Sequence, residues 1–299
     1  MKNYLLLNLC IIFSFMLQAQ QVIPLYQGKI PNSRNVPDPE KLLERGENNR
    51  AYVDTAIPTL TIFKPKFPNG KAVIICPGGG YARTAFDKEG TLVAQSLVKD
   101  SITAFVLKYR IPQDFTNVDK SLAPLQDAQQ AIRWVRQHAK KHQVASNQIG
   151  IMGFSAGGHL ASSAATNFEK NADSNETDTT SFRPDFVILI YPVISFSDEL
   201  THLGSRNNLI GENPKDVNVL LWSNEKQVTS DSPPAFLVHA ADDKVVPVGN
   251  SLAYYSACIE NEVSVEMHLY PKGGHGFGMF NTTTKDNWMD RLRNWLEGI

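Results

Sequence analysis

The chain reads Gly153-Phe154-Ser155-Ala156-Gly157-Gly158 at the point that decides its fold. Residues 148–152 before it form a short apolar run typical of a strand, and residues 159–165 after it are mostly small helix formers. This order predicts a strand, a tight turn and a helix, the setting in which a G-x-S-x-G serine becomes a nucleophile. The flanking glycines tolerate the strained turn, and the new helix directs its positive N-terminus towards the serine hydroxyl. The stretch therefore predicts a serine hydrolase with Ser155 as its nucleophile.

Segments on both sides of this turn alternate between strand and helix patterns. Strands are expected at residues 59–63, 71–76, 103–109, 148–152, 186–191, 235–239 and 264–270. The central ones are continuous apolar runs, as expected for strands that are covered on both faces. Helices are expected at residues 90–99, 125–142, directly after Ser155, 251–261 and 285–296. The alternation predicts an α/β class protein with a doubly wound, mostly parallel sheet and helices on both faces. On such a sheet, the strand, turn and helix around Ser155 resemble the arrangement of the α/β-hydrolase fold.

Length and composition are consistent with a single folded domain. The chain has 299 residues, of which 42% are hydrophobic and 20% charged, so it can bury a sizeable core. A net charge of -1 gives no electrostatic reason to expect nucleic acid as a partner. No Cys/His spacing indicates a metal site, and we expect no metal and no cofactor. Cys76 and Cys258 are expected to be buried free thiols.

The N-terminus has the pattern of a secretory signal. Lys2 supplies a positive charge, residues 4–17 are an apolar run too short to span a membrane, and Ala19 offers a cleavage site. We expect residues 1–19 to be a signal peptide, so that the mature protein is periplasmic or secreted and has no membrane attachment. Residues 20–58 lack a clear period and are expected to be an N-terminal arm lying over the domain. Residues 59–299 form the expected catalytic domain, with residues 195–232 as a small cap-like insertion over the pocket.

A serine hydroxyl needs a base, and the base needs an orienting acid. In this fold both partners follow later strands, the acid first and the histidine last. Two acids, Asp242 and Asp243, follow the strand at 235–239, and we favour Asp243 because the apolar Val-Val-Pro that buries the loop follows it at the usual distance. Of the 7 histidines, only His275 lies in a glycine-rich loop after the last strand. The predicted triad is therefore Ser155, Asp243 and His275.

The other histidines near these motifs are better explained as structural. His239 and His268 fall inside predicted strands, and His159 lies on the helix after the nucleophile. We expect His239 and His268 to be structural histidines with satisfied hydrogen bonds, and His159 to pack rather than react.

The attacked carbonyl also needs hydrogen-bond donors for its developing negative charge. Pro77-Gly78-Gly79-Gly80-Tyr81 follows a core strand, in the position of the H-G-G-G loop of lipases and esterases, with Pro77 in place of the histidine. The amides of Gly79, Gly80 and Ala156 are the expected oxyanion donors. A phosphate-binding loop is excluded because no G-x-x-x-x-G-K-[ST] or G-x-G-x-x-G pattern is present.

Together these motifs resemble the secreted α/β-hydrolase esterases of the acetylxylan-esterase and feruloyl-esterase type. The matching segments are residues 77–81, 108–110, 127–139, 153–159, 204–211, 223–225, 233–236, 243–247 and 273–278. The resemblance implies a carbohydrate esterase that takes an acylated carbohydrate or other small ester as its substrate. A feruloyl esterase or general carboxylesterase is the alternative. A prolyl oligopeptidase-like peptidase is a more distant one, because the arm before residue 59 is too short for the propeller of those enzymes.

Three residues are candidates for substrate contact. Arg206 and Trp222, in the insertion, are candidates to contact a sugar, although Arg206 equally suits a role in tying its loop to the core. Tyr81, beside the expected oxyanion loop, either lines the acyl pocket or packs. A lipase is disfavoured because the insertion is polar and charged rather than apolar.

Overall fold

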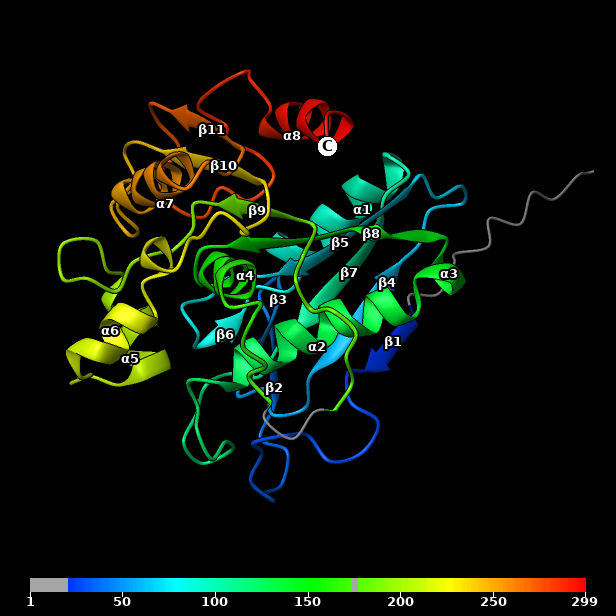
Figure 1. The fold of residues 1–299 in the computed structure, drawn as a ribbon, viewed down its shortest axis with the longest axis vertical. Coiled ribbons are helices and arrows are strands. Elements are labelled where there is room, and N and C mark those ends of the chain that lie inside the picture. Colours follow the sequence, from blue (N-terminus) through cyan, green and yellow to red (C-terminus); the bar gives the residue numbers. More distant parts are fainter. Residues whose placement is uncertain (1–20, 174–176) are drawn as a thin grey trace, which may run out of the picture.

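The computed structural model describes residues 21–173 and 177–299, and a sheet of eight strands forms its centre (Figure 1). The predicted signal peptide lies outside these residues. The order across the sheet is β1-β4-β7-β5-β8-β9-β10-β11. Among these eight strands, β4 alone runs in the opposite direction, because it pairs antiparallel with both β1 and β7. The strands are β1 (Gln21–Pro24), β4 (Thr59–Phe63), β5 (Gly70–Cys76), β7 (Thr103–Lys108), β8 (Val144–Phe154), β9 (Phe186–Ile190), β10 (Ala235–Ala240) and β11 (Val265–Tyr270).

The seven strands expected from the sequence are all present in this sheet. β8 differs most from its prediction because it begins at Val144, which pairs with Gly70. A register shift separates that pair from the regular pairing of Ala72 with Ile149. Polar residues lie between Val144 and Ile149, so the hydrophobicity pattern does not show that the strand begins at Val144. The predicted doubly wound, mostly parallel sheet is confirmed.

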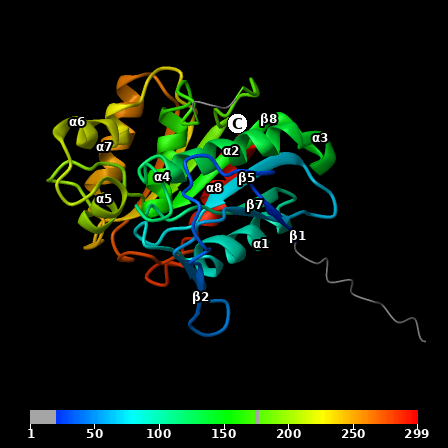
Figure 2. The ribbon, with the colours of Figure 1, turned by 90° about the horizontal axis from the view of Figure 1, so that it is seen from below.

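Helices cover both faces of the sheet, and Figure 2 shows α2 and α1 on opposite sides of β5 and β7. Successive residues of β5 pack in two separate hydrophobic cores. Ile74 lies in the core that includes α2, α4 and α7, and Ile75 lies in the core that includes α1 and α8. Strands that pack on both faces need side chains that are apolar throughout, which explains their uninterrupted runs. The helices are α1 (Leu92–Lys99), α2 (Ala123–Gln137), α3 (Ala139–His142), α4 (Ala156–Thr166), α5 (Leu203–Ile210), α6 (Asp216–Leu221), α7 (Gly249–Glu260) and α8 (Trp288–Glu297).

Two short helical segments and one interruption complete the pattern. η1 (Asp87–Thr91) is a π-helical turn that leads directly into α1, and η2 (Asn224–Lys226) is a 3₁₀ turn. The helix predicted over residues 125–142 is two helices, because His138 leaves the helical region at φ -100° and ψ 11°. Its ring stacks on Trp134 at a centroid distance of 4.1 Å. Cys76 and Cys258 are buried and free, as expected.

The segment before residue 59 is more ordered than the predicted arm. β1 joins the edge of the main sheet, and β2 (Lys41–Glu44) with β3 (Arg50–Val53) forms a hairpin that pairs with β6 (Arg83–Thr84). These strands have only two to four residues, and much of β2 is exposed, so no alternating pattern marks them. Within the described chain, no helix combines the length and the apolar composition needed to cross a bilayer.

Candidate active site

Ser155 occupies the sharp turn between β8 and α4. Its backbone has φ 52° and ψ -120°, outside the region that non-glycine residues favour. The turn is too tight for side chains on either side: a Cβ on Gly153 would lie 2.0 Å from the Gly157 carbonyl oxygen. A Cβ on Gly157 would lie 2.1 Å from the Cys76 carbonyl oxygen. The two glycines of the motif are therefore required by steric contact.

The three residues of the predicted triad lie in one hydrogen-bonded line. His275 Nε2 is 2.9 Å from Ser155 Oγ, and His275 Nδ1 is 2.7 Å from Asp243 Oδ2. A carboxylate can only accept, so Nδ1 carries the proton and Nε2 is free to accept from the serine hydroxyl. This is the tautomer that a general base requires.

Asp243 is held as an anion by four donors. Its Oδ1 accepts from the Val245 and Val246 amides at 2.9 Å each, and its Oδ2 accepts from His275 and from His239 Nε2, the latter at 3.2 Å. Burial alone would raise the pKa of Asp243, but the hydrogen bonds from His239 and His275 outweigh it and hold the pKa well below the usual value. His239 is buried in β10, as expected, yet it touches the candidate acid, which its sequence position did not reveal.

Asp242 has a different partner. Its Oδ1 accepts from the Gly274 amide at 2.8 Å, so it fixes the loop that carries His275 rather than the imidazole itself. The structure thus places Asp243, the acid that the sequence favoured, against the histidine.

The glycine-rich loop after β5 lies beside Ser155. Gly79 and Gly80 line the same cavity as the serine and have φ of 134° and 67°, which suit glycine. The Tyr109 hydroxyl donates to the Pro77 carbonyl at 2.7 Å, and the Gly78 amide donates to Glu89. The expected oxyanion donors, Gly79, Gly80 and Ala156, therefore lie on the two backbone segments that flank the serine hydroxyl.

Glu89 is a buried acid that sequence reasoning missed. Its Oε2 accepts from the Gly78 amide at 2.8 Å, and its Oε1 accepts from the Tyr191 hydroxyl at 2.8 Å. The same tyrosine oxygen accepts from the Gly278 amide at 3.0 Å. Burial raises the pKa of Glu89. The Glu89 carboxyl thus connects the glycine-rich loop to the loop that carries His275. Its neighbours in the sequence are polar, so the hydrophobicity pattern does not predict that Glu89 is buried.

A cavity of about 440 Å³ opens above Ser155 and His275. Part of its wall comes from the β2–β3 hairpin, through Arg45, Asn49 and Ala51. The insertion contributes His202, whose side chain caps α5 by accepting from the Ser205 amide at 3.2 Å. Neither the hairpin nor His202 was singled out by the sequence.

The three residues expected as candidates for substrate contact are not among those that line this cavity. Tyr81 is 1% exposed, and its hydroxyl is 2.9 Å from His159 Nδ1. Arg206 donates to the Phe196 carbonyl and to Asp198, so it ties its loop to the core. The Trp222 carbonyl bonds His159 Nε2 at 2.8 Å, and Trp222 lines a separate hollow under α2. Tyr81 and Arg206 thus make the packing and tethering contacts that the structural alternative describes, and Trp222 lies away from Ser155; contact of the three residues with substrate stays a prediction.

His159 packs as predicted. It is fully buried between Tyr81 and Trp222, and its ring stacks on Phe196 at a centroid distance of 4.3 Å. Burial lowers the pKa of His159 to about 4, so the ring is neutral at pH 7.

Comparison with known proteins places this chain in a family. The BD-FAE family model matches residues 60–257. The chain is 38% identical over 246 residues to an acetylxylan esterase from Xylanibacter ruminicola. The aligned region covers 80% of this chain and 48% of that protein. It is 37% identical over 218 residues to endo-1,4-beta-xylanase B from Butyrivibrio fibrisolvens, covering 72% of this chain and 34% of that protein. The chain thus spans about half or less of the length of these relatives.

Among solved structures, the acetyl ester-xyloside bifunctional hydrolase from Caldicellulosiruptor lactoaceticus superimposes with a TM-score of 0.74 at 36% identity. The match covers 93% of this chain and 96% of that one. A sugar hydrolase from Lactococcus lactis gives a TM-score of 0.64 at 26% identity, covering 87% of this chain and 97% of that one.

Proposed function

The chain belongs to the BD-FAE family and has the fold of its esterase relatives, and from this premise we propose that it is a carbohydrate esterase that removes acetyl groups from plant or algal polysaccharide fragments such as acetylated xylan. The observation that carries the proposal is the hydrogen-bonded line from Asp243 through His275 to Ser155 at the floor of an open cavity. The names of the relatives, an acetylxylan esterase and an acetyl ester-xyloside hydrolase, support the acetyl group and the sugar.

In the proposed mechanism the serine attacks first. His275 Nε2 takes the Ser155 proton as Oγ adds to the acetyl carbonyl carbon, and Asp243 stabilises the imidazolium that forms. The carbonyl electrons move onto the oxygen, where the amides of Gly79, Gly80 and Ala156 stabilise the negative charge. His275 then protonates the sugar oxygen, and the alcohol leaves an acetyl group on Ser155.

Water completes the cycle. His275 takes a proton from a water molecule, whose oxygen adds to the acetyl carbon, and the collapse of this second intermediate returns the proton to Ser155 and releases acetate. The sequence further supports export, with cleavage after Ala19, so that the enzyme meets its substrate outside the cytoplasm.

The test is acid release from acetylated xylo-oligosaccharides, with a feruloylated oligosaccharide alongside and Ser155→Ala as the blank. Acetate release by the wild type alone supports the proposal. Ferulate release in its place would transfer the activity to the feruloyl esterase class. Hydrolysis of an activated acetate with no acid from either oligosaccharide would exclude the carbohydrate and leave a general carboxylesterase.

A further inference from the structure

Three cationic side chains line the catalytic cavity, and each comes from a different element. Arg45 lies in the turn of the β2–β3 hairpin, Arg83 lies in β6, and Lys88 lies in η1. The triad chemistry described above uses none of them. Because all three line one cavity, this cavity suits a ligand with negative charge.

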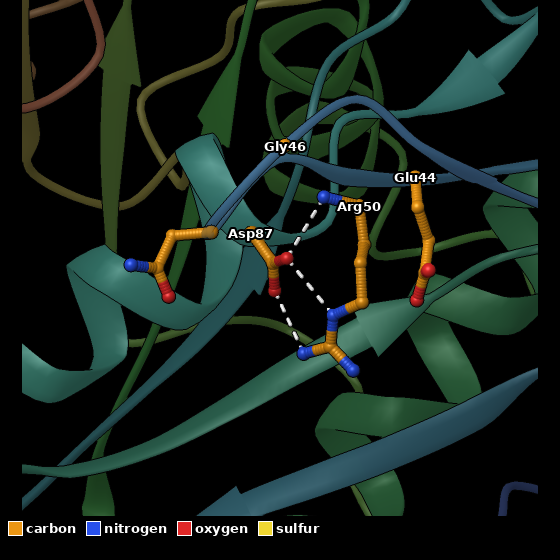
Figure 3. Close-up of a pocket in the computed structure, with 5 residues that line it drawn as sticks. Glu44, Gly46, Arg50 and Asp87 are labelled. Carbon is orange, nitrogen blue, oxygen red and sulfur yellow. Dashed lines mark hydrogen bonds and ion pairs between the residues drawn. The ribbon is translucent and has the colours of Figure 1, made fainter.

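The hairpin turn that carries Arg45 is firmly fixed. At its base, the Arg50 backbone amide and guanidinium make three hydrogen bonds to Asp87, at 2.8, 2.9 and 2.8 Å (Figure 3). Within the turn, the Asn49 side chain donates to the Arg45 carbonyl at 3.3 Å. The hairpin is thereby anchored to η1, which places the backbone of Arg45 at the cavity wall.

The stems of the other two cations cover the loops of the catalytic site. Arg83 Cγ lies 2.8 Å from the point where a Cβ on Gly79 would stand, so this side chain packs over the expected oxyanion loop. Lys88 Cε and Cγ lie 3.5 Å from the corresponding point on Gly278, in the loop after His275. Long cationic side chains commonly pack their stems in this way while the charged ends face solvent.

The acid that shares the cavity with these three side chains has other hydrogen-bond partners. The one acid lining the cavity, Glu89, is buried, and both of its oxygens already accept from Gly78 and Tyr191. Glu44 lines a neighbouring hollow, beside Arg50 (Figure 3). Within the described parts of the chain, Arg45, Arg83 and Lys88 form no ion pair with a carboxylate.

We propose that Arg45, Arg83 and Lys88 form a subsite for a substrate carboxylate, so that the preferred substrate is an acetylated oligosaccharide carrying a uronic acid. This inference rests on the proposed function: an acetyl group carries no charge, so the carboxylate belongs to the sugar part. A cavity of about 440 Å³ has room for more than an acetyl group. Arginine binds carboxylates through two parallel hydrogen bonds, which gives selectivity as well as affinity.

The test compares kcat/KM for two acetylated xylo-oligosaccharides of equal length, one neutral and one with a glucuronic acid substituent. The wild type should favour the acidic substrate by about tenfold or more at low salt, equivalent to one good charge-assisted contact. High salt should reduce the preference. Arg83→Gln and Arg45→Gln should each lower the ratio by about threefold or more, because each removes part of the positive charge. Lys140→Gln, an exposed charge on α3, is the matched control and should keep the wild-type ratio.

The outcomes separate the subsite from the proposed function. A wild-type ratio near one, or a ratio unchanged in both arginine variants, overturns the subsite while hydrolysis of the neutral substrate leaves the esterase proposal standing. Hydrolysis of an activated acetate with no acetate from either oligosaccharide overturns both. A further pair of activated esters, succinyl and acetyl, locates the charge: a succinyl preference that the same variants remove assigns the carboxylate to the acyl group and overturns the uronic acid assignment.

Discussion

Replacing Asp243 by asparagine should disable the histidine through its tautomer. Asp243 Oδ1 accepts from two backbone amides, so the asparagine oxygen must take that position. Its NH₂ group then faces His275 Nδ1, in place of the oxygen that now lies 2.7 Å away. Two donors cannot bond, so His275 moves its proton to Nε2 and can no longer accept the proton of Ser155.

The size of the effect follows from this geometry. Loss of the productive tautomer in a Ser-His-Asp triad costs about 10⁴-fold in kcat, or about 5.5 kcal/mol. The assay is steady-state hydrolysis of an activated acetate ester, with circular dichroism to verify the fold. Asp242→Asn is the matched control, because asparagine retains an oxygen for the Gly274 amide, and its kcat should fall less than about fivefold. An Asp243→Asn enzyme within tenfold of the wild type, or a larger loss in Asp242→Asn, would refute the assignment of the acid.

Three further changes test other parts of the account. Ser155→Ala should lower kcat by about 10⁴-fold or more while the melting temperature stays within a few degrees, since the hydroxyl is needed for chemistry and not for packing. A folded, fully active variant would show that Ser155 is not the nucleophile. Asp87→Asn should lower the free energy of unfolding by about 1–3 kcal/mol in urea at pH 7, because it weakens the Arg50 contacts. Burial raises the pKa of Asp87, but the hydrogen bonds from Arg50 lower it overall. The stabilisation is therefore present above the ordinary pKa of 3.8 and is lost as the pH falls through the depressed pKa. If wild type and Asp87→Asn differed in free energy of unfolding by the same amount at pH 7 and well below that pKa, this explanation would be wrong. Glu89→Ala leaves the Gly78 and Tyr191 donors without their acceptor, and it should lower the free energy of unfolding by about 2–4 kcal/mol and kcat by about tenfold, as measured in urea titrations and steady-state assays; unchanged values for both would show that the carboxyl does not hold the two loops.

Much of the fold was predictable because its strands are buried on both faces. Ile74 and Ile75 contact opposite cores, so β5 shows as an unbroken apolar run, and the strands with this pattern all fall in the central sheet. The expected triad was also accessible, because each of its residues follows a predicted strand directly and two of them, Ser155 and His275, have glycines on both sides. The membership of the esterase family, inferred from these loops, is confirmed by the family match.

The walls of the cavity were not predictable in the same way. The β2–β3 hairpin has strands of only four residues, and β2 is largely exposed. Its position depends on contacts with residues distant in the sequence, the pairing of β3 with β6 and the bonds of Arg50 to Asp87. His202 caps a short helix in a polar insertion, and Glu89 is buried in the helical turn before α1. Each of these placements arises from tertiary contacts that leave no periodic pattern in the sequence.

The central claim, that Ser155 carries the acyl group, is tested most directly by trapping the intermediate. The wild-type enzyme is mixed with an activated acetate ester, quenched in acid within the first turnover and digested for mass spectrometry. We expect one added acetyl group on the peptide that contains Ser155, and none on that peptide from Ser155→Ala. An acetyl group on a different residue would contradict the assignment of Ser155 as the acyl carrier. Acetate release by Ser155→Ala at the wild-type rate would contradict it as well.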